Sequence, residues 1–403
     1  MRTRWLVSMS LALAVAGCSS NGGGFGENLA LPTLGTANAR ATGPIGASSR
    51  SVSWPEFGFI PAGGRLNPHE RILSSRNVHR LRKRWSFITG CVGSICGVDS
   101  SPAVANGVIY IGSYDGNVYA LDAATGAKRW SFLTGDRVFS SPAVVNGVVY
   151  VGALDHNVYA LNAATGAKVW SYTTGYDVAS SPAVANGVVY IGSEDGNIYA
   201  LNATTGAKLW SFATHLGTDS SPALANGMLY VGSAEGNVYA LNAANGSKVW
   251  SFPTGGNVES SPAVANGLVY FGSSDGNVYA LNAATGAKVW SFPASDYVNA
   301  SPAVANGAVY AGSIDGNVYA LKAATGAKLW SYNTGNLVFS SAAVAHGVVY
   351  VGSENGVVYA FRAATGTKLW SYRTGERVFS SPSVANGMVY VGSADLHVYA
   401  FGL

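Results

Sequence analysis

The chain has 403 residues, of which 48% are hydrophobic and only 11% charged, and it contains 51 glycines. This composition is typical of a turn-rich, all-β globular protein and excludes a disordered, highly charged chain. The net charge of +4 is small, and the basic run at residues 76–85 is better explained as a solvated edge strand than as a polyanion contact, so we expect no nucleic-acid partner.

The N-terminus has the features of an export signal. Arg2 and Arg4 precede an apolar stretch at residues 5–17, which is too short for a membrane span. The following "VAGC" resembles the lipobox of bacterial lipoproteins, which implies that residues 1–18 are a signal peptide and that Cys18 is lipidated; a plain signal peptide is the alternative. Ser19 implies, by resemblance to Gram-negative lipoproteins, the outer membrane facing the periplasm.

Two further segments precede the regular part of the chain. Residues 19–50 are rich in Gly, Ala, Ser and Pro and predict a flexible tether. Residues 51–80 lead into the folded domain, which we expect at 81–403. Cys91 and Cys96 predict a local disulfide in an exported protein, and a metal site is the weaker alternative because no histidine cluster is near.

A 40-residue repeat dominates the rest of the chain. Each copy contains four short apolar segments separated by Asn-Gly, Asp-Gly and Thr-Gly turns, which predicts one four-stranded propeller blade. The first three segments occur eight times, and the last copy lacks the fourth, whereas an additional fourth segment surrounds Trp85. We therefore predict an all-β, eight-bladed β-propeller of four-stranded antiparallel blades, closed by the Trp85 strand joining the C-terminal blade.

The segment "ALDAATGAKRW" (120–130) and its copies resemble the repeat of pyrroloquinoline-quinone (PQQ) enzymes, A-x-D-x-x-T-G-x-x-x-W. This resemblance covers residues 54–403 and implies the propeller fold. It also implies a packing role, between neighbouring blades, for Trp85, Trp130, Trp170, Trp210, Trp250, Trp290, Trp330 and Trp370.

The same resemblance gives little support to quinone chemistry. The quinone enzymes hold their cofactor in the propeller centre between a tryptophan floor and a vicinal disulfide, beside calcium. Here every Trp except Trp5 and Trp54 stands at a docking position, and Cys91 and Cys96 are not vicinal. We therefore expect no cofactor and no catalytic residues, with PQQ and calcium as alternatives. The six scattered histidines carry no pattern, and we interpret His156 as drift within the repeat.

Only positions that differ between blades can form a unique site. The copies differ mainly after each Trp segment and before the Asp-Gly turn, and these two places fall on one face of a propeller, whereas the constant turns fall on the other. We predict an interaction face at Arg137, Phe139, Tyr176, Asp177, Tyr297, Phe339, Arg377 and Phe379.

Oxygen ligands for a cation are the alternative use of that face. Asp219, Glu259 and Asn299 come from three adjacent blades and could hold calcium. In overall fold, size and anchoring the chain resembles the propeller lipoproteins of outer-membrane β-barrel assembly. We expect a non-enzymatic, monomeric lipoprotein that binds an envelope protein or cell-wall partner; a quinoprotein-like dehydrogenase or a calcium or small-ligand binder is the alternative.

Overall fold

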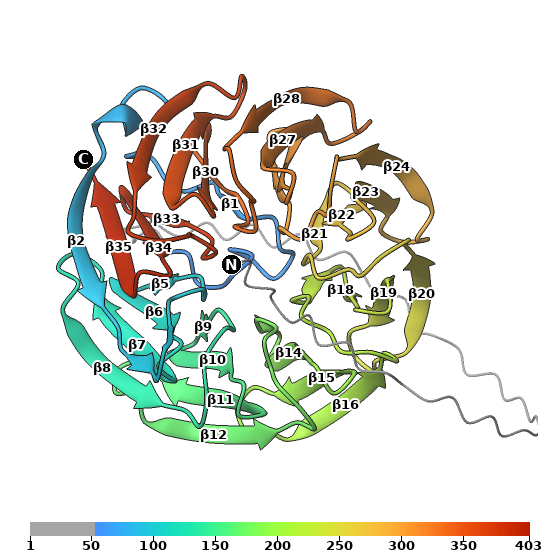
Figure 1. Cartoon of the computed structure of the whole chain (residues 1–403). Helices are drawn as coiled ribbons and strands as arrows, with labels where there is room; N and C mark the ends of the chain where they lie inside the picture. Colours follow the sequence, from blue (N-terminus) through green and yellow to red (C-terminus); the bar gives the residue numbers. More distant parts are fainter. Residues whose placement is uncertain (1–52) are drawn as a thin grey trace, which may run out of the picture. The chain divides into compact units, whose positions relative to one another are not determined.

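The computed structural model describes residues 53–403, which form a ring of four-stranded antiparallel sheets (Figure 1). Each sheet is one blade and corresponds to one copy of the repeat, so the predicted eight-bladed β-propeller is confirmed. Within these residues the single helix is the 3₁₀ helix η1 (Val78–Arg80), and no helix has the length and apolar character needed to cross a membrane. The predicted signal peptide, Cys18 and the tether lie outside the described residues.

The strands of blades 1–4 are β5 (Ala103–Ala105), β6 (Val108–Gly112), β7 (Asn117–Asp122), β8 (Lys128–Leu133); β9 (Ala143–Val145), β10 (Val148–Gly152), β11 (Asn157–Asn162), β12 (Lys168–Thr173); β13 (Ala183–Ala185), β14 (Val188–Ser193), β15 (Asn197–Asn202), β16 (Lys208–Ala213); and β17 (Ala223–Ala225), β18 (Met228–Gly232), β19 (Asn237–Asn242), β20 (Lys248–Pro253). Those of blades 5–8 are β21 (Ala263–Ala265), β22 (Leu268–Gly272), β23 (Asn277–Asn282), β24 (Lys288–Pro293); β25 (Ala303–Ala305), β26 (Ala308–Gly312), β27 (Asn317–Lys322), β28 (Lys328–Asn333); β29 (Ala343–Ala345), β30 (Val348–Ser353), β31 (Val357–Arg362), β32 (Lys368–Arg373); and β33 (Ser383–Ala385), β34 (Met388–Gly392), β35 (His397–Gly402), β2 (Arg82–Ile88).

Blade 8 closes the ring from both ends of the described chain. Strand β2 pairs antiparallel with β35, with Ser86 opposite Tyr399, and so supplies the fourth strand that the last repeat lacks. In Figure 1 the blue β2 lies beside the red β35. The closing strand predicted at Trp85 is therefore present in the structure.

Two kinds of turn meet at one end of blades 1–7, and blade 8 has only the first kind because no turn joins β35 to β2. The Asn-Gly turn joins the first and second strands, and the Thr-Gly turn joins the third and fourth; the Ala163 N–H donates to the Gly147 carbonyl at 2.9 Å and ties one to the other. Asn106 and Gly107 have φ values of 50° and 75°, the left-handed pair that a tight hairpin turn requires. We call the end formed by these turns the constant face.

The remaining loops meet at the opposite end, which we call the variable face. It consists of the turns between second and third strands and the connections that follow each fourth strand. The Leu154 N–H donates to the Arg137 carbonyl, and the Glu194 N–H donates to the Asp177 carbonyl, both at 2.9 Å. Each connection is thus fastened to a turn of the next blade, and the places where the repeats differ lie together.

The inner strands have continuous apolar runs because blades pack against one another on both sides. All five residues of β6 are buried. Each fourth strand instead alternates, and its tryptophan docks on the next blade: the Trp130 indole N–H donates to the Ala163 carbonyl at 2.9 Å. The indole ring of Trp130 lies only 2.8 Å from the position that a Cβ on Gly166 would occupy, so only glycine fits beneath the indole.

The same docking continues across the closure of the ring. The Trp370 indole N–H donates to the Leu81 carbonyl, and that of Trp85 donates to the Ala123 carbonyl, both at 3.1 Å. The two ends of the chain are therefore joined by the contact that joins consecutive blades.

Candidate interaction face

An aromatic arc lies at the mouth of the central channel on the variable face. Phe139, Phe339 and Phe379 are half-buried, and the rings of Phe339 and Phe379 lie 5.3 Å apart. The guanidinium of Arg137 lies 5.5 Å from the Phe139 ring centroid, and that of Arg377 lies 5.1 Å from that of Phe379. Stacked arginine and phenylalanine offer a partner both apolar area and fixed positive charge.

One acidic group interrupts the aromatic arc. Asp99 accepts a hydrogen bond from the Tyr114 hydroxyl, and Tyr114 packs edge-on against Phe139 with ring centroids 4.7 Å apart. Burial raises the pKa of Asp99 to about 6, although the Tyr114 hydrogen bond and nearby Arg377 oppose the shift. Sequence reasoning did not foresee this tyrosine partner of Asp99.

An acidic arc occupies the blades opposite. It comprises Asp177, Glu194, Asp219 and Glu259. Burial first, and then the charges of Asp219 and Asp177, raise the pKa of Glu194 to about 7. Burial and Glu259 likewise raise the pKa of Asp219 to about 6. Four carboxylates that oppose one another's ionisation form a surface suited to a cationic group of a partner.

Two of the three oxygen ligands predicted for calcium, Glu259 and Asn299, are hydrogen-bonded to each other. The Asn299 side-chain amide donates its N–H to Glu259 at 2.7 Å, and its oxygen accepts from the Ser274 hydroxyl at 3.2 Å. In residues 53–403 no three or more His, Cys, Asp or Glu side chains group in a way that could hold a metal ion. The side-chain amide of Asn299 would have to flip before its oxygen could coordinate calcium together with Asp219 and Glu259.

His156 belongs to the variable face, so its interpretation as drift missed a surface contact. Its ring stacks on that of Tyr176 with centroids 5.4 Å apart, and its Nδ1 lies 3.0 Å from the Asp177 carboxylate. Tyr176 and Tyr297 are both about half exposed. The sequence signal that could have found His156 is its position at the Asp-Gly turn, where six of the eight copies have glycine.

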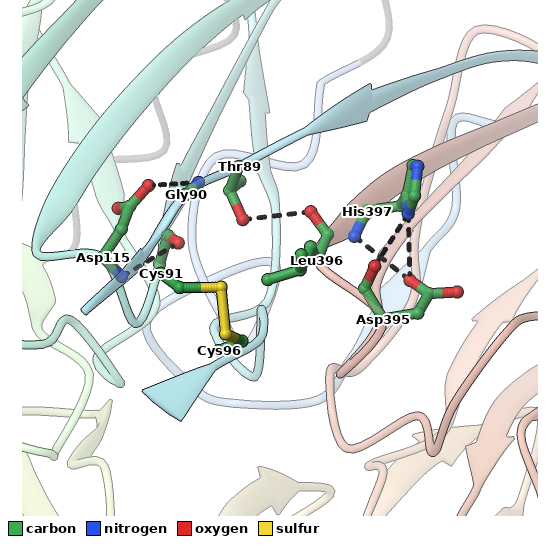
Figure 2. Close-up of a disulfide and its surroundings, with 9 residues drawn as sticks. Thr89, Gly90, Cys91, Cys96, Asp115, Asp395, Leu396 and His397 are labelled. Atoms are coloured by element: carbon green, nitrogen blue, oxygen red, sulfur yellow. Dashed lines mark hydrogen bonds and ion pairs between the residues drawn. A yellow bond between two sulfur atoms is a disulfide. The ribbon is translucent and has the colours of Figure 1, made fainter. Parts of the chain in front are cut away.

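An additional hairpin lies on this face, and a disulfide links its two strands (Figure 2). Cys91 and Cys96 pair at a sulfur–sulfur distance of 2.04 Å and face each other across strands β3 (Cys91–Val92) and β4 (Ile95–Cys96). The hairpin stands in the connection from blade 8 to blade 1 and exposes Val92 and Ile95. Its base is fixed because the Gly90 N–H donates to Asp115 at 2.6 Å.

The centre of the ring is filled by residues 54–67, which we call the channel segment (Figure 1, blue). It bonds to the inner strand of every blade in turn. Six inner-strand N–H groups donate to its carbonyls at 2.6–3.0 Å, from Val104, Val144, Leu224, Val264, Val304 and Val344. In blade 3 the Val184 N–H bonds to the Glu56 side chain, and in blade 8 the Asn67 amide donates to the Val384 carbonyl at 2.7 Å.

Two ionisable side chains of the channel segment are buried. Glu56 is 4% exposed, its Oε2 has no hydrogen-bond partner, and burial raises its pKa to about 8. Arg65 donates to the carbonyls of Ala342 at 2.8 Å and Pro382 at 3.0 Å, and burial lowers its pKa to about 9. Carbonyl dipoles thus satisfy the guanidinium, whereas Glu56 is favoured in its neutral form.

A ring of serines encircles the channel beside this segment. The backbone N–H of each donates to the hydroxyl of its counterpart in the next blade at 2.9–3.0 Å, and the last returns to the first: Ser101, Ser141, Ser181, Ser221, Ser261, Ser301, Ser341 and Ser381. The cavity left between this ring and Glu56 measures about 20 Å³, which is room for one water molecule.

These contacts test whether a quinone fits the propeller centre. The channel segment occupies the middle of the ring, and a cavity for one water is far smaller than a tricyclic cofactor. The docking tryptophans are engaged by neighbouring blades, as Trp130 illustrates. The residues at the propeller centre therefore do not fit pyrroloquinoline quinone.

Fold and repeat define a PQQ-like β-propeller protein. A family model described as "Beta-alanine-activating enzyme, beta-propeller" matches residues 189–403, slightly more than half of the chain, and the chain belongs to this propeller family. A second model, described as "Outer membrane protein assembly factor BamB", matches residues 75–221.

Individual proteins show the same two similarities. The quinoprotein glucose dehydrogenase of Escherichia coli is 30% identical over 135 residues, which cover 32% of this chain and only 16% of that protein. The chain thus matches about a sixth of this curated relative. BamB from Moraxella catarrhalis superposes with a TM-score of 0.70 at 21% identity, over 80% of this chain and 100% of that one. The quinohemoprotein alcohol dehydrogenase ADHIIG from Pseudomonas putida HK5 gives 0.74 at 21% identity, over 88% and 80%.

Proposed function

We propose that this protein is a non-enzymatic, exported lipoprotein whose propeller is a rigid scaffold and whose variable face binds a protein partner in the cell envelope. One observation carries the proposal: the side chains that differ between blades gather on one face as a basic-aromatic arc opposite an acidic arc. Such a surface offers apolar area and charge of both signs without a catalytic constellation.

Location in the envelope is supported by three observations. The N-terminal sequence has the pattern of a lipoprotein signal ending at Cys18. The Cys91–Cys96 disulfide suits an oxidising compartment. The family model that matches residues 75–221 bears the name of an outer-membrane assembly factor, and a BamB structure superposes over its whole length.

The test is capture of crosslinked partners from envelope membranes with matched variants of the full chain. We expect Arg137→Ala/Phe139→Ala/Arg377→Ala/Phe379→Ala to reduce recovery of a partner at least about tenfold, because aromatic and arginine side chains dominate interface energies. The control Ser131→Ala/Ser171→Ala/Ser211→Ala/Ser251→Ala changes four exposed residues of the outer strands, away from the variable face, and should leave recovery unchanged. Equal recovery with both variants would refute the variable face as the docking surface.

A quinoprotein dehydrogenase is the second candidate, and the 30% identity to the glucose dehydrogenase favours it. Because the channel segment fills the centre, we expect no dye-linked alcohol or glucose oxidation after addition of pyrroloquinoline quinone and calcium. Turnover above the no-protein background would contradict the scaffold proposal. Calcium binding alone would appear as a rise in melting temperature that Asp219→Ala and Glu259→Ala both abolish.

A further inference from the structure

The charges of this molecule are separated between its two faces. Sixteen of the chain's 20 Asp and Glu residues lie in turns and connections of the variable face. Within residues 53–403 the arginines that accompany them are Arg137, Arg373 and Arg377. Part of the acidic set is structural: Asp155, for example, accepts from the Gly135 N–H of the preceding blade at 2.6 Å. The total charge of +4 hides this separation, because the two faces nearly cancel.

A belt of lysines surrounds the opposite end of the ring. In every blade one exposed lysine stands opposite the same residue of the third strand, as Lys128 opposite Leu121 and Lys168 opposite Leu161. The closing strand completes the belt with Lys83 opposite Phe401. These positions lie at the start of the fourth strands, in blades 1–7 two residues after the glycine of the Thr-Gly turn or its Asn-Gly equivalent, and so border the constant face. We call the eight equivalent lysines the lysine belt.

Few carboxylates neutralise this end. Within residues 53–403 the Asp and Glu side chains here are Asp122, which pairs with Arg129 at 2.7 Å, and Glu70, which is fully buried. Further positive charge comes from Lys322 and Arg362 in the Thr-Gly turns. The constant face and its rim therefore have a strong positive potential.

Exposed aliphatic side chains follow the lysines of the belt. Val169, Leu209, Val249, Val289 and Leu329 each come directly after a belt lysine and are 45–52% exposed. A lysine beside a half-exposed Val or Leu suits a lipid headgroup region, where the charge meets phosphate and the aliphatic group leaves water. A nucleic-acid surface would favour arginine forks, but arginine follows the belt lysine at only two of the eight positions, Arg84 and Arg129, and valine or leucine at the other six.

The described chain begins at the same end. Trp54 pairs antiparallel with Val104, and the first strand of each blade runs from the variable face to the constant face. The chain therefore enters the channel from the constant face. Residue 67 pairs parallel with β29, so the segment also leaves on that side. A lipid on Cys18, which precedes Ser53 by 35 residues, would tether the protein by its constant face.

We propose that the constant face and the lysine belt rest on an anionic lipid surface, which directs the acidic variable face away from the bilayer. This orientation rests on the proposed lipoprotein function and adds its lipid class and its geometry. Charge complementarity and the side on which the chain enters select the anionic bilayer as the occupant.

Site-resolved acylation of lysines, read by mass spectrometry, tests the orientation on the full exported chain. The protein is reconstituted into vesicles of phosphatidylcholine with or without 30% phosphatidylglycerol, and the anchor inserts equally into both. We expect the acylation rate of belt lysines to fall at least about fivefold on the anionic vesicles and to recover in 0.5 M NaCl. Carbodiimide labelling of Asp177 and Asp296 on the variable face should not change.

Two variants with the same change in charge complete the test. Lys168→Glu/Lys208→Glu/Lys248→Glu should abolish protection of the neighbouring belt lysines, whereas Arg137→Glu/Arg373→Glu/Arg377→Glu should retain it. Equal loss in both variants, equal protection on the two vesicles, no protection, or protection by duplex DNA in place of vesicles would overturn the proposal. Failure of partner capture alone would refute the proposed docking face and would leave this result standing.

Discussion

The two faces of the propeller differ in what their side chains contact. On the constant face and in the channel, side chains bond to the neighbouring blade: the Trp130 indole to Ala163, and the Tyr110 hydroxyl to the same carbonyl at 3.1 Å. On the variable face the distinctive side chains contact one another or solvent, as His156 does with Tyr176. Substitutions on the constant face or in the channel should therefore lower the free energy of unfolding, whereas substitutions on the variable face should weaken partner binding.

Truncation of a docking tryptophan is the strongest test of this contrast. We expect Trp85→Ala to lower the free energy of unfolding by about 3–5 kcal/mol, because it removes a buried ring and opens the junction between the chain ends. Denaturant unfolding followed by circular dichroism measures it. Trp250→Ala should cost a similar amount inside the ring, and Phe139→Ala on the variable face should cost less than half as much. Similar losses of unfolding free energy for Trp85→Ala and Phe139→Ala would contradict the contrast between the docking contacts and the variable face.

The channel segment makes stability depend on pH through Glu56. The pKa of its carboxyl is about 8 in the folded protein against an ordinary value of 4.5, so the unfolded chain loses its proton first as pH rises. The stabilisation is complete below pH 4.5 and is lost as pH rises through 8, by on the order of a few kcal/mol.

The matched variant Glu56→Gln isolates this contribution, because the raised pKa values of Asp219 and Glu194 give slopes of the same sign. We expect the difference in unfolding free energy between the variant and the wild type to grow in favour of the variant from pH 5 to pH 8. A constant difference over that range would show that Glu56 ionises equally in both states.

Removal of the disulfide should have a smaller effect. Cys91→Ala/Cys96→Ala opens a loop of only a few residues on the variable face, so we expect a loss of at most about 2 kcal/mol. Amide exchange should increase at Val92 and Ile95 and stay unchanged in β2, whose pairing with β35 does not involve the hairpin. A loss as large as that of Trp85→Ala would place the hairpin among the structural contacts.

Sequence periodicity was sufficient to predict the eight blades, the closing Trp85 strand and the division into two faces, because each follows from a 40-residue spacing. The channel segment could not be predicted, because residues 54–67 have no repeat and their partners are backbone groups up to 317 residues away. The acidic arc was partly visible in Asp219 and Glu259, but its coupling to Glu194 depends on distances that only the closed ring creates.

The acidic arc gives the smallest and most local prediction. Burial and then the charge of Asp219 raise the pKa of Glu194 to about 7, so Asp219→Asn should lower that pKa by roughly several tenths of a unit and leave the melting temperature nearly unchanged. Carboxyl ¹³C NMR titration measures the change directly. The control is Asp296→Asn, which is also on the variable face and should leave the pKa of Glu194 unchanged.

If both variants shift the pKa of Glu194 equally, the arc is a diffuse acidic surface and not a coupled cluster. If neither variant shifts it, burial alone sets the pKa. A selective shift would mean that a single cation of a partner, placed between Asp219 and Glu194, stabilises both ionised carboxylates and binds more tightly as pH rises through 7.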